Sequence, residues 1–143
     1  MIRLLVIGAL LLTPTVATAA PPGCNPLYIY KATITRVIDG DTVVANIDLG
    51  FDTWRNNERV RLHGIDAPEM RGDERQAGLR AKAALAGAIE GRRVIVCTIP
   101  DRNGRDRTGS FRRYLGRIFT VEGQPFSINA WMVLRGFAKP YAR

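Results

Sequence analysis

The sequence has little of the material from which many catalytic centres are built. Among its 143 residues there is one histidine, His63, and there are two cysteines, Cys24 and Cys97. It contains no helical pair of metal ligands, no thiol–imidazole pair and no phosphate-binding loop. His63 falls on the polar face of a predicted strand, where we expect an ordinary surface residue rather than an acid–base catalyst. These absences leave carboxylates and arginines as the groups able to carry chemistry.

Long apolar runs are also scarce, and the longest stands at residues 4–12, near the N-terminus. A short positive start precedes it, and Ala17-Thr18-Ala19 fits a small-residue cleavage site. This pattern predicts a secretory signal peptide over residues 1–19, because the run is too short and wrongly flanked for a spanning helix. An uncleaved membrane anchor is the alternative. We therefore expect an exported protein, either periplasmic or extracellular.

Acidic residues are outnumbered by basic ones, 13 against 21, which gives a formal net charge of +8. Removal of the signal peptide takes away one arginine and leaves about +7 by the same count. Such an excess favours a polyanionic partner, either nucleic acid or a membrane surface, although simple solubility is an alternative. No amphipathic basic helix with a bulky apolar face is present, so no membrane partner is expected after signal cleavage.

The two cysteines both follow the predicted cleavage site. An even number of cysteines in an exported protein favours a disulfide. A Cys24–Cys97 bridge would tie an N-terminal arm, residues 20–27, to a central strand. Two buried free thiols are the alternative.

The remaining chain, residues 28–143, is predicted to be one domain without internal repeats. Residues 48–57 and 101–113 lack periodicity and are predicted loops. Apolar alternation and turn residues predict five strands, at residues 28–37, 41–47, 58–64, 94–99 and 114–121. Helical spacing predicts a helix at residues 73–89, after the third strand, and a short one at 128–135, after the fifth. This order predicts a mainly β, α+β fold: a five-stranded Greek-key barrel of the oligonucleotide-binding type.

Four carboxylates fall at predicted strand ends. Asp39 and Asp41 flank the first turn, and Asp66 and Glu69 follow the third strand. Acids crowded together in a basic protein suggest a divalent cation with oxygen ligands, which would offset their repulsion. Taken singly, Asp39-Gly40-Asp41 also suits a plain turn, and Glu69 also suits the start of a helix.

A phosphodiesterase could be assembled from these groups. Asp41 and Asp66, with a backbone carbonyl near Ala67, could hold a cation that polarises a phosphoryl oxygen. Glu69 could orient or deprotonate a water molecule. Arg61 points away from the apolar strand face, and with an arginine from the charged loop it could grip phosphate oxygens. An ordinary surface position is the alternative for Arg61.

Several motifs in order carry a family resemblance. The combination begins with Val37-Ile38-Asp39-Gly40-Asp41-Thr42 and Arg61-Leu62-x-Gly64-Ile65-Asp66-Ala67-Pro68-Glu69. It continues with the alanine-striped helix, Arg113-Tyr114-Leu115-Gly116, and Ile128-Asn129-x-x-Met132-Val133-x-x-Gly136-Phe137-Ala138. The set resembles the staphylococcal nuclease-like (thermonuclease) family over residues 28–139.

The resemblance implies the same barrel and a Ca2+-dependent endonuclease that leaves 3′-phosphate ends on DNA and RNA. Single strands are the expected preferred substrate, and a monomer is the expected state. By position, the resemblance implies these roles: Asp41, Asp66 and the Ala67 carbonyl as Ca2+ ligands, Asp39 as an outer-shell acid, Glu69 as general base, and Arg61 as a phosphate-binding arginine.

The second phosphate-binding arginine departs from the family pattern, which usually reads Asp-Lys/Arg-Tyr-Gly-Arg before the fifth strand. Counting back from Tyr114 favours Arg113, with Arg112 where glycine is expected. Arg107 and Tyr141 are the predicted substrate-binding residues, and Tyr141 could equally be simple packing. Ala67 stands where some members have threonine, which costs little if the carbonyl is the ligand. A non-catalytic nucleic-acid-binding barrel of the same fold is the alternative function.

Overall fold

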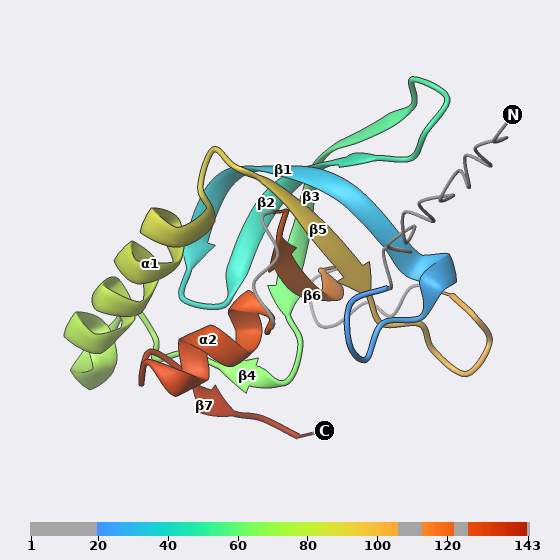
Figure 1. Ribbon diagram of the computed structural model, residues 1–143. Coiled ribbons are helices and arrows are strands. Elements are labelled where there is room, and N and C mark those ends of the chain that lie inside the picture. The colour runs from blue at the N-terminus through green and yellow to red at the C-terminus, as the bar shows by residue number, and fades with distance from the viewer. Residues whose placement is uncertain (1–19, 106–112, 122–125, 143) are drawn as a thin grey trace, which may run out of the picture.

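A computed structural model describes residues 20–105, 113–121 and 126–142. Five strands close into a barrel in the order β1-β2-β3-β6-β5 (Figure 1). The strands are β1 (Ile29–Asp39), β2 (Thr42–Asp48), β3 (Trp54–Leu62), β5 (Arg93–Thr98) and β6 (Tyr114–Thr120). Strands β3 and β6 pair in parallel, and the other neighbours pair antiparallel. The predicted five-stranded barrel of the oligonucleotide-binding type is confirmed.

The barrel core is filled by β-branched and leucine side chains from alternating strand positions. Val43, Val60 and Ile118 are fully buried. Helix α1 (Arg75–Ile89) adds Ala81, Leu85 and Ile89 from one face, as the predicted stripe of small and apolar residues requires. Helix α2 (Ile128–Leu134) begins at Ser127, whose side chain accepts a hydrogen bond from the Ala130 N–H, and it adds Met132.

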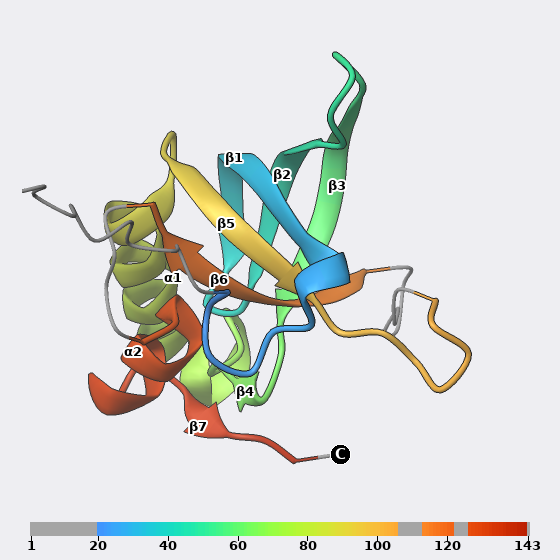
Figure 2. The same ribbon diagram turned by 45° about the vertical axis from the view of Figure 1, so that its right-hand side comes forward.

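The predicted loop at residues 48–57 is wrong in its second half, because β3 already begins at Trp54. Residues 54–57 are exposed, and Asn57 adopts a positive φ of 59° where β3 bulges against β2. This end of the β2–β3 hairpin projects beyond the barrel (Figure 2). Without a buried face it carries no apolar alternation, so periodicity cannot reveal it.

A small sheet of β4 (Ile65–Asp66) and β7 (Lys139–Pro140) was absent from the sequence prediction. Two-residue strands are too short to show a period. The predicted helix at residues 73–89 begins two residues late, at Arg75, after a 3₁₀ turn, η2 (Gly72–Glu74). Neither helix in the described ranges is long and apolar enough to cross a bilayer.

The N-terminal arm is held against the barrel as predicted. A disulfide joins Cys24 to Cys97 on β5, with Cα atoms 5.9 Å apart. The arm continues through a 3₁₀ turn, η1 (Pro26–Tyr28), into β1, and Arg117 on β6 donates a hydrogen bond to the Gly23 carbonyl. The predicted disulfide is confirmed, whereas the predicted signal peptide, residues 1–19, lies outside the described residues.

Candidate active site

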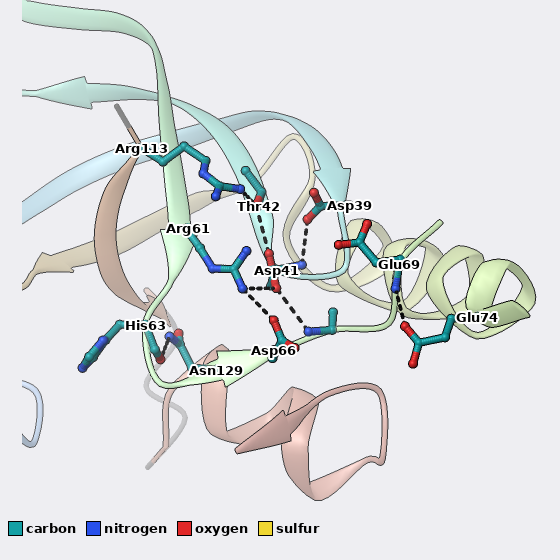
Figure 3. A network of polar contacts seen from close by, with 11 residues as sticks. Asp39, Asp41, Thr42, Arg61, His63, Asp66, Glu69, Glu74, Arg113 and Asn129 are labelled. Atoms are coloured by element: carbon teal, nitrogen blue, oxygen red, sulfur yellow. Dashed lines mark hydrogen bonds and ion pairs between the residues drawn. The ribbon is translucent and has the colours of Figure 1, made fainter. Parts of the chain in front are cut away.

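One open pocket of about 390 Å³ gathers most of the predicted site residues. It lies where the β1–β2 turn, the end of β3, the segment after β4 and the start of β6 meet (Figure 3). Its charged lining residues are Asp39, Asp41, Arg61, Asp66, Glu69, Arg71 and Arg113. Acidic residues and arginines from segments far apart in the sequence thus line the same pocket.

The β1–β2 turn fixes the first two acids. The Asp39 carboxylate accepts a hydrogen bond from the Asp41 N–H at 3.0 Å, and the Asp41 carbonyl accepts one from the Leu62 N–H at 2.8 Å. Gly40 between them has no room for a side chain, because an added Cβ would lie 2.6 Å from the Ala67 Cβ. This close approach sets the turn directly against the segment that follows β4.

The Asp41 carboxylate is buried, with only 4% of the residue exposed. It accepts hydrogen bonds from the Thr42 hydroxyl at 3.0 Å and the Ala67 N–H at 3.1 Å. Burial raises the pKa of the Asp41 carboxyl, and the nearby Asp39 charge adds to the rise. The Ala67 hydrogen bond and the Arg61 charge oppose that rise only in part. Burial therefore disfavours the charged form of Asp41, and a positive charge beside the carboxylate stabilises that form.

Arg61 lies between the two acids that were predicted to bind metal. Its Nη2 atom is 3.0 Å from Asp41 Oδ2 and 2.8 Å from Asp66 Oδ1. One cationic nitrogen therefore bridges two carboxylates that come from different elements (Figure 3). It is a natural stand-in for a small cation, and the donors around it are oxygens, the ligands that Ca2+ prefers.

The donor set is nonetheless small. Within residues 20–105, 113–121 and 126–142, no group of three or more histidine, cysteine, aspartate or glutamate side chains could together hold a metal. Ca2+ also takes backbone carbonyls and water molecules as ligands, and Ala67 lines the same pocket as the two carboxylates. Asp39 lines the same pocket, and its carboxylate accepts a hydrogen bond from the backbone of the turn.

Asp66 owes its place to the small β4–β7 sheet. It pairs with Lys139, and the Tyr141 N–H donates to the Gly64 carbonyl at 2.9 Å just beyond. The C-terminal segment thus clamps the strand that carries Asp66. Tyr141 itself is 42% exposed and is not among the residues that line the pocket.

Glu69 lines the pocket with an exposed carboxylate, 69% of its side chain being accessible. Its N–H donates to Glu74 at 3.1 Å, and Arg71 lies 3.9 Å from its carboxylate. Helix α1 approaches this backbone closely, since a Cβ added at Gly78 would overlap the Glu69 carbonyl. Glu69 is therefore held by its backbone while its side chain faces solvent at the pocket.

Arg113 reaches the pocket from the start of β6. Its Nη1 atom lies 3.5 Å from the hydroxyl of Thr42, the residue that also donates to Asp41. Arg113 and Arg61 thus approach the Asp41–Thr42 pair from two neighbouring strands (Figure 3). Arg107 and Arg112 lie outside the described residues.

Asn129 was not predicted to have a role, yet it joins three elements beneath the site. Its side chain donates to the carbonyls of His63 and Gly116 and accepts from the Ile118 N–H, all within 3.0 Å. A buried amide on a short helix gives no signal of such contacts in the sequence. The His63 ring is directed away from the carboxylates in Figure 3.

The arrangement can bind a phosphodiester between arginines and present acids to it. Comparison with known protein families supports this interpretation. The family model described as staphylococcal nuclease homologue matches residues 59–143, more than half of the chain. That match begins after Asp39 and Asp41, which the β1–β2 turn brings to the pocket. Among curated proteins, no sequence matches this chain. The chain belongs to the staphylococcal nuclease homologue family, and its barrel is a nuclease-like, nucleic-acid-binding domain.

Proposed function

We propose that this protein is a Ca2+-dependent endonuclease that hydrolyses DNA and RNA, preferably single-stranded, to 3′-phosphate ends. It would act as a monomer after export to the periplasm or beyond. One observation carries the proposal: Arg61 bridges Asp41 and Asp66 in a pocket that Glu69 and Arg113 also line. A module that only bound nucleic acid would have no need for clustered acids, which repel phosphate.

Asp41, Asp66 and the Ala67 carbonyl would hold the Ca2+ ion. When bound there, Ca2+ supplies charge that polarises a phosphoryl oxygen and neutralises the two carboxylates. The Arg61 guanidinium would then no longer be needed to neutralise the charge of those carboxylates, and it could bind two phosphate oxygens at once. Removing one such preorganised donor costs on the order of 10²–10³ in rate.

Arg113 would hold the phosphate from the other side, through the guanidinium that lies beside Thr42. Two arginines on the same phosphate orient it and stabilise the negative charge that grows on its oxygens. Asp41 and Thr42 keep this geometry because their hydrogen bonds run to the Ala67 backbone and to each other.

Glu69 would take the proton of the attacking water molecule. The water oxygen forms a bond to phosphorus, the bond from phosphorus to the 5′ oxygen breaks, and that oxygen takes up a proton from water. The product is a 3′-phosphate on one fragment and a 5′-hydroxyl on the other. A carboxylate that lines the pocket and is exposed to solvent suits this role, because water reaches it directly.

A second candidate function is a binding module without catalysis. The small donor set favours it, because no three histidine, cysteine or acidic side chains of the described residues could together hold a metal. Arg61 and Arg113 would then bind phosphate groups without cleaving the chain.

Glu69→Gln separates the two candidates. We expect hydrolysis of single-stranded DNA to fall by about 10²–10³ while DNA binding is nearly intact, because the substitution removes only the proton acceptor. Asp73→Asn is the matched control, since Asp73 is an exposed acid nearby that does not line the pocket. Unchanged turnover in Glu69→Gln would remove Glu69 from the mechanism.

A further inference from the structure

The hairpin between β2 and β3 carries apolar side chains that the fold leaves in solvent. It projects beyond the barrel in both views (Figures 1 and 2). Phe51 at its tip is 102% exposed, and Leu49 and Trp54 beside it are 42% and 49% exposed. Single exposed apolar residues are common, but three within six residues on one protruding tip form a patch.

Phe51 contributes little to the turn that carries it. The turn is closed by other groups: the Asp48 carboxylate accepts from the Gly50 N–H at 2.8 Å, and the Gly50 carbonyl accepts from the Thr53 N–H at 2.9 Å. Phe51 and Asp52 adopt positive φ values of 50° and 55°. A bulky residue is unfavourable in this left-handed conformation, where glycine or asparagine would fit better. The contacts of the turn therefore do not account for a phenylalanine here, whereas a contact outside the fold would.

The tip and the pocket lie on one continuous face. Residues 42, 44, 46 and 48 of β2 point to the same side of the sheet, and their cross-strand partners share that side. The partners on β3 are Arg61 for Thr42, Arg59 for Val44 and Trp54 for Asp48. Strand β3 thus begins beside the exposed tip with Trp54 and ends at the pocket with Arg61.

The stretch between the tip and the pocket is basic. Arg36 and Lys31 of β1 occupy the same rows as Arg59 and Trp54, because they pair with Val44 and Asp48. Arg36, Lys31 and Arg59 are exposed, and none of them forms an ion pair with any residue that the structure describes. Arg36 and Arg59 flank Val44 in one row, and Lys31 stands in the row nearer the tip, so the stretch offers phosphates cations at two levels.

We propose that this outer face of β1–β3 guides a single nucleic-acid strand away from the pocket, with its bases stacked on Phe51 and Trp54. The inference rests on the proposed function and extends its substrate site. From Thr42 to Asp48 the face is about 20 Å long, and single barrels of this type cover roughly 4–16 nucleotides. Nucleic acid fits better than an anionic lipid surface, because the exposed rings of Phe51 and Trp54 can stack on bases, and lipid headgroups have no bases.

The test compares Phe51→Asn with the unchanged tip, both in a Glu69→Gln background, in which we expect cleavage to be about 10²–10³-fold slower. Binding with Ca2+ is measured by fluorescence anisotropy for a labelled single strand of ~12 nucleotides and for a dinucleotide. We expect the longer strand to bind about tenfold more weakly in Phe51→Asn, as loss of one stacked base predicts. The dinucleotide should bind equally to both proteins.

Two controls keep the test independent of folding. Asparagine suits the left-handed backbone, so the melting temperature of Phe51→Asn should be equal or higher. Leu134→Asn removes another exposed apolar side chain, 72% accessible and located on α2, and should leave both affinities unchanged.

Equal binding of the longer strand with and without Phe51 would overturn the inference and leave the proposed function standing. Phe51-dependent binding to anionic phospholipid vesicles in place of the strand, or a Phe51-dependent dimer in sedimentation, would also overturn it. A protein with Glu69 intact that cleaves no single strand, together with a Glu69→Gln variant that binds none, would contradict the proposed function. The inference rests on that function and would then be wrong as well.

Discussion

Replacing Arg61 by glutamine should weaken hydrolysis and yet strengthen Ca2+ binding. In the structure one Arg61 nitrogen lies 3.0 Å or less from both Asp41 and Asp66, so it competes with a metal for the same two carboxylates. Unit charges about 4 Å apart interact by roughly 1 kcal/mol in water and roughly 4 kcal/mol at an intermediate dielectric. Because the Asp66 side chain is 56% exposed, the lower part of this range applies.

We therefore expect Ca2+ to bind Arg61→Gln more tightly by about 1–2 kcal/mol, or roughly 5- to 30-fold. Isothermal titration calorimetry without substrate measures the affinity, and the rise in melting temperature on adding Ca2+ gives a second measure. Arg55→Gln is the control, because it removes a positive charge from the far end of β3 that is paired with Glu58. Equal or weaker Ca2+ binding in Arg61→Gln would refute the claim that Arg61 occupies the cation position.

Three further substitutions test other parts of the account. Burial raises the pKa of the Asp41 carboxyl, so folding favours the protonated form. The stability of the fold therefore falls as pH rises from the pKa of the unfolded state to that of the folded state. Asp41→Asn should raise the melting temperature at neutral pH without metal, and Ca2+ should no longer increase the melting temperature of this variant. Replacing Cys24 and Cys97 by serine removes a cross-link across 73 residues and should lower the free energy of unfolding by about 2–4 kcal/mol in denaturant titrations. Gly40→Ala places a Cβ 2.6 Å from the Ala67 Cβ. We expect the free energy of unfolding to fall by about 1–3 kcal/mol and the activity to fall as well. Unchanged stability and activity in this variant would show that the turn can shift.

The barrel could be predicted from the sequence because its strands bury one face and therefore alternate. The same parity correctly directed Arg61 away from the core that holds Val60 and Leu62. Turn chemistry at Asp39-Gly40-Asp41 placed two acids at a hairpin end. The convergence of these groups followed from the family resemblance, and the structure brings Asp41, Arg61 and Asp66 into contact.

What escaped prediction has no periodic or compositional signal. Residues 54–57 belong to an exposed hairpin end, and β4 and β7 are only two residues each. The Asn129 contacts depend on how α2 docks against two strand ends, which no local pattern encodes. That a single Arg61 nitrogen bridges both acids is likewise a matter of tertiary geometry.

The central claim is that the pocket around Asp41, Arg61 and Asp66 cleaves phosphodiester bonds with the help of Ca2+. Digestion of single-stranded DNA by the purified protein, with Ca2+ and with a chelator, tests it most directly when the ends of the fragments are also analysed. The account predicts cleavage that requires Ca2+ and leaves 3′-phosphate ends. Intact DNA in both conditions, together with salt-sensitive binding, would contradict it and favour a module that only binds nucleic acid.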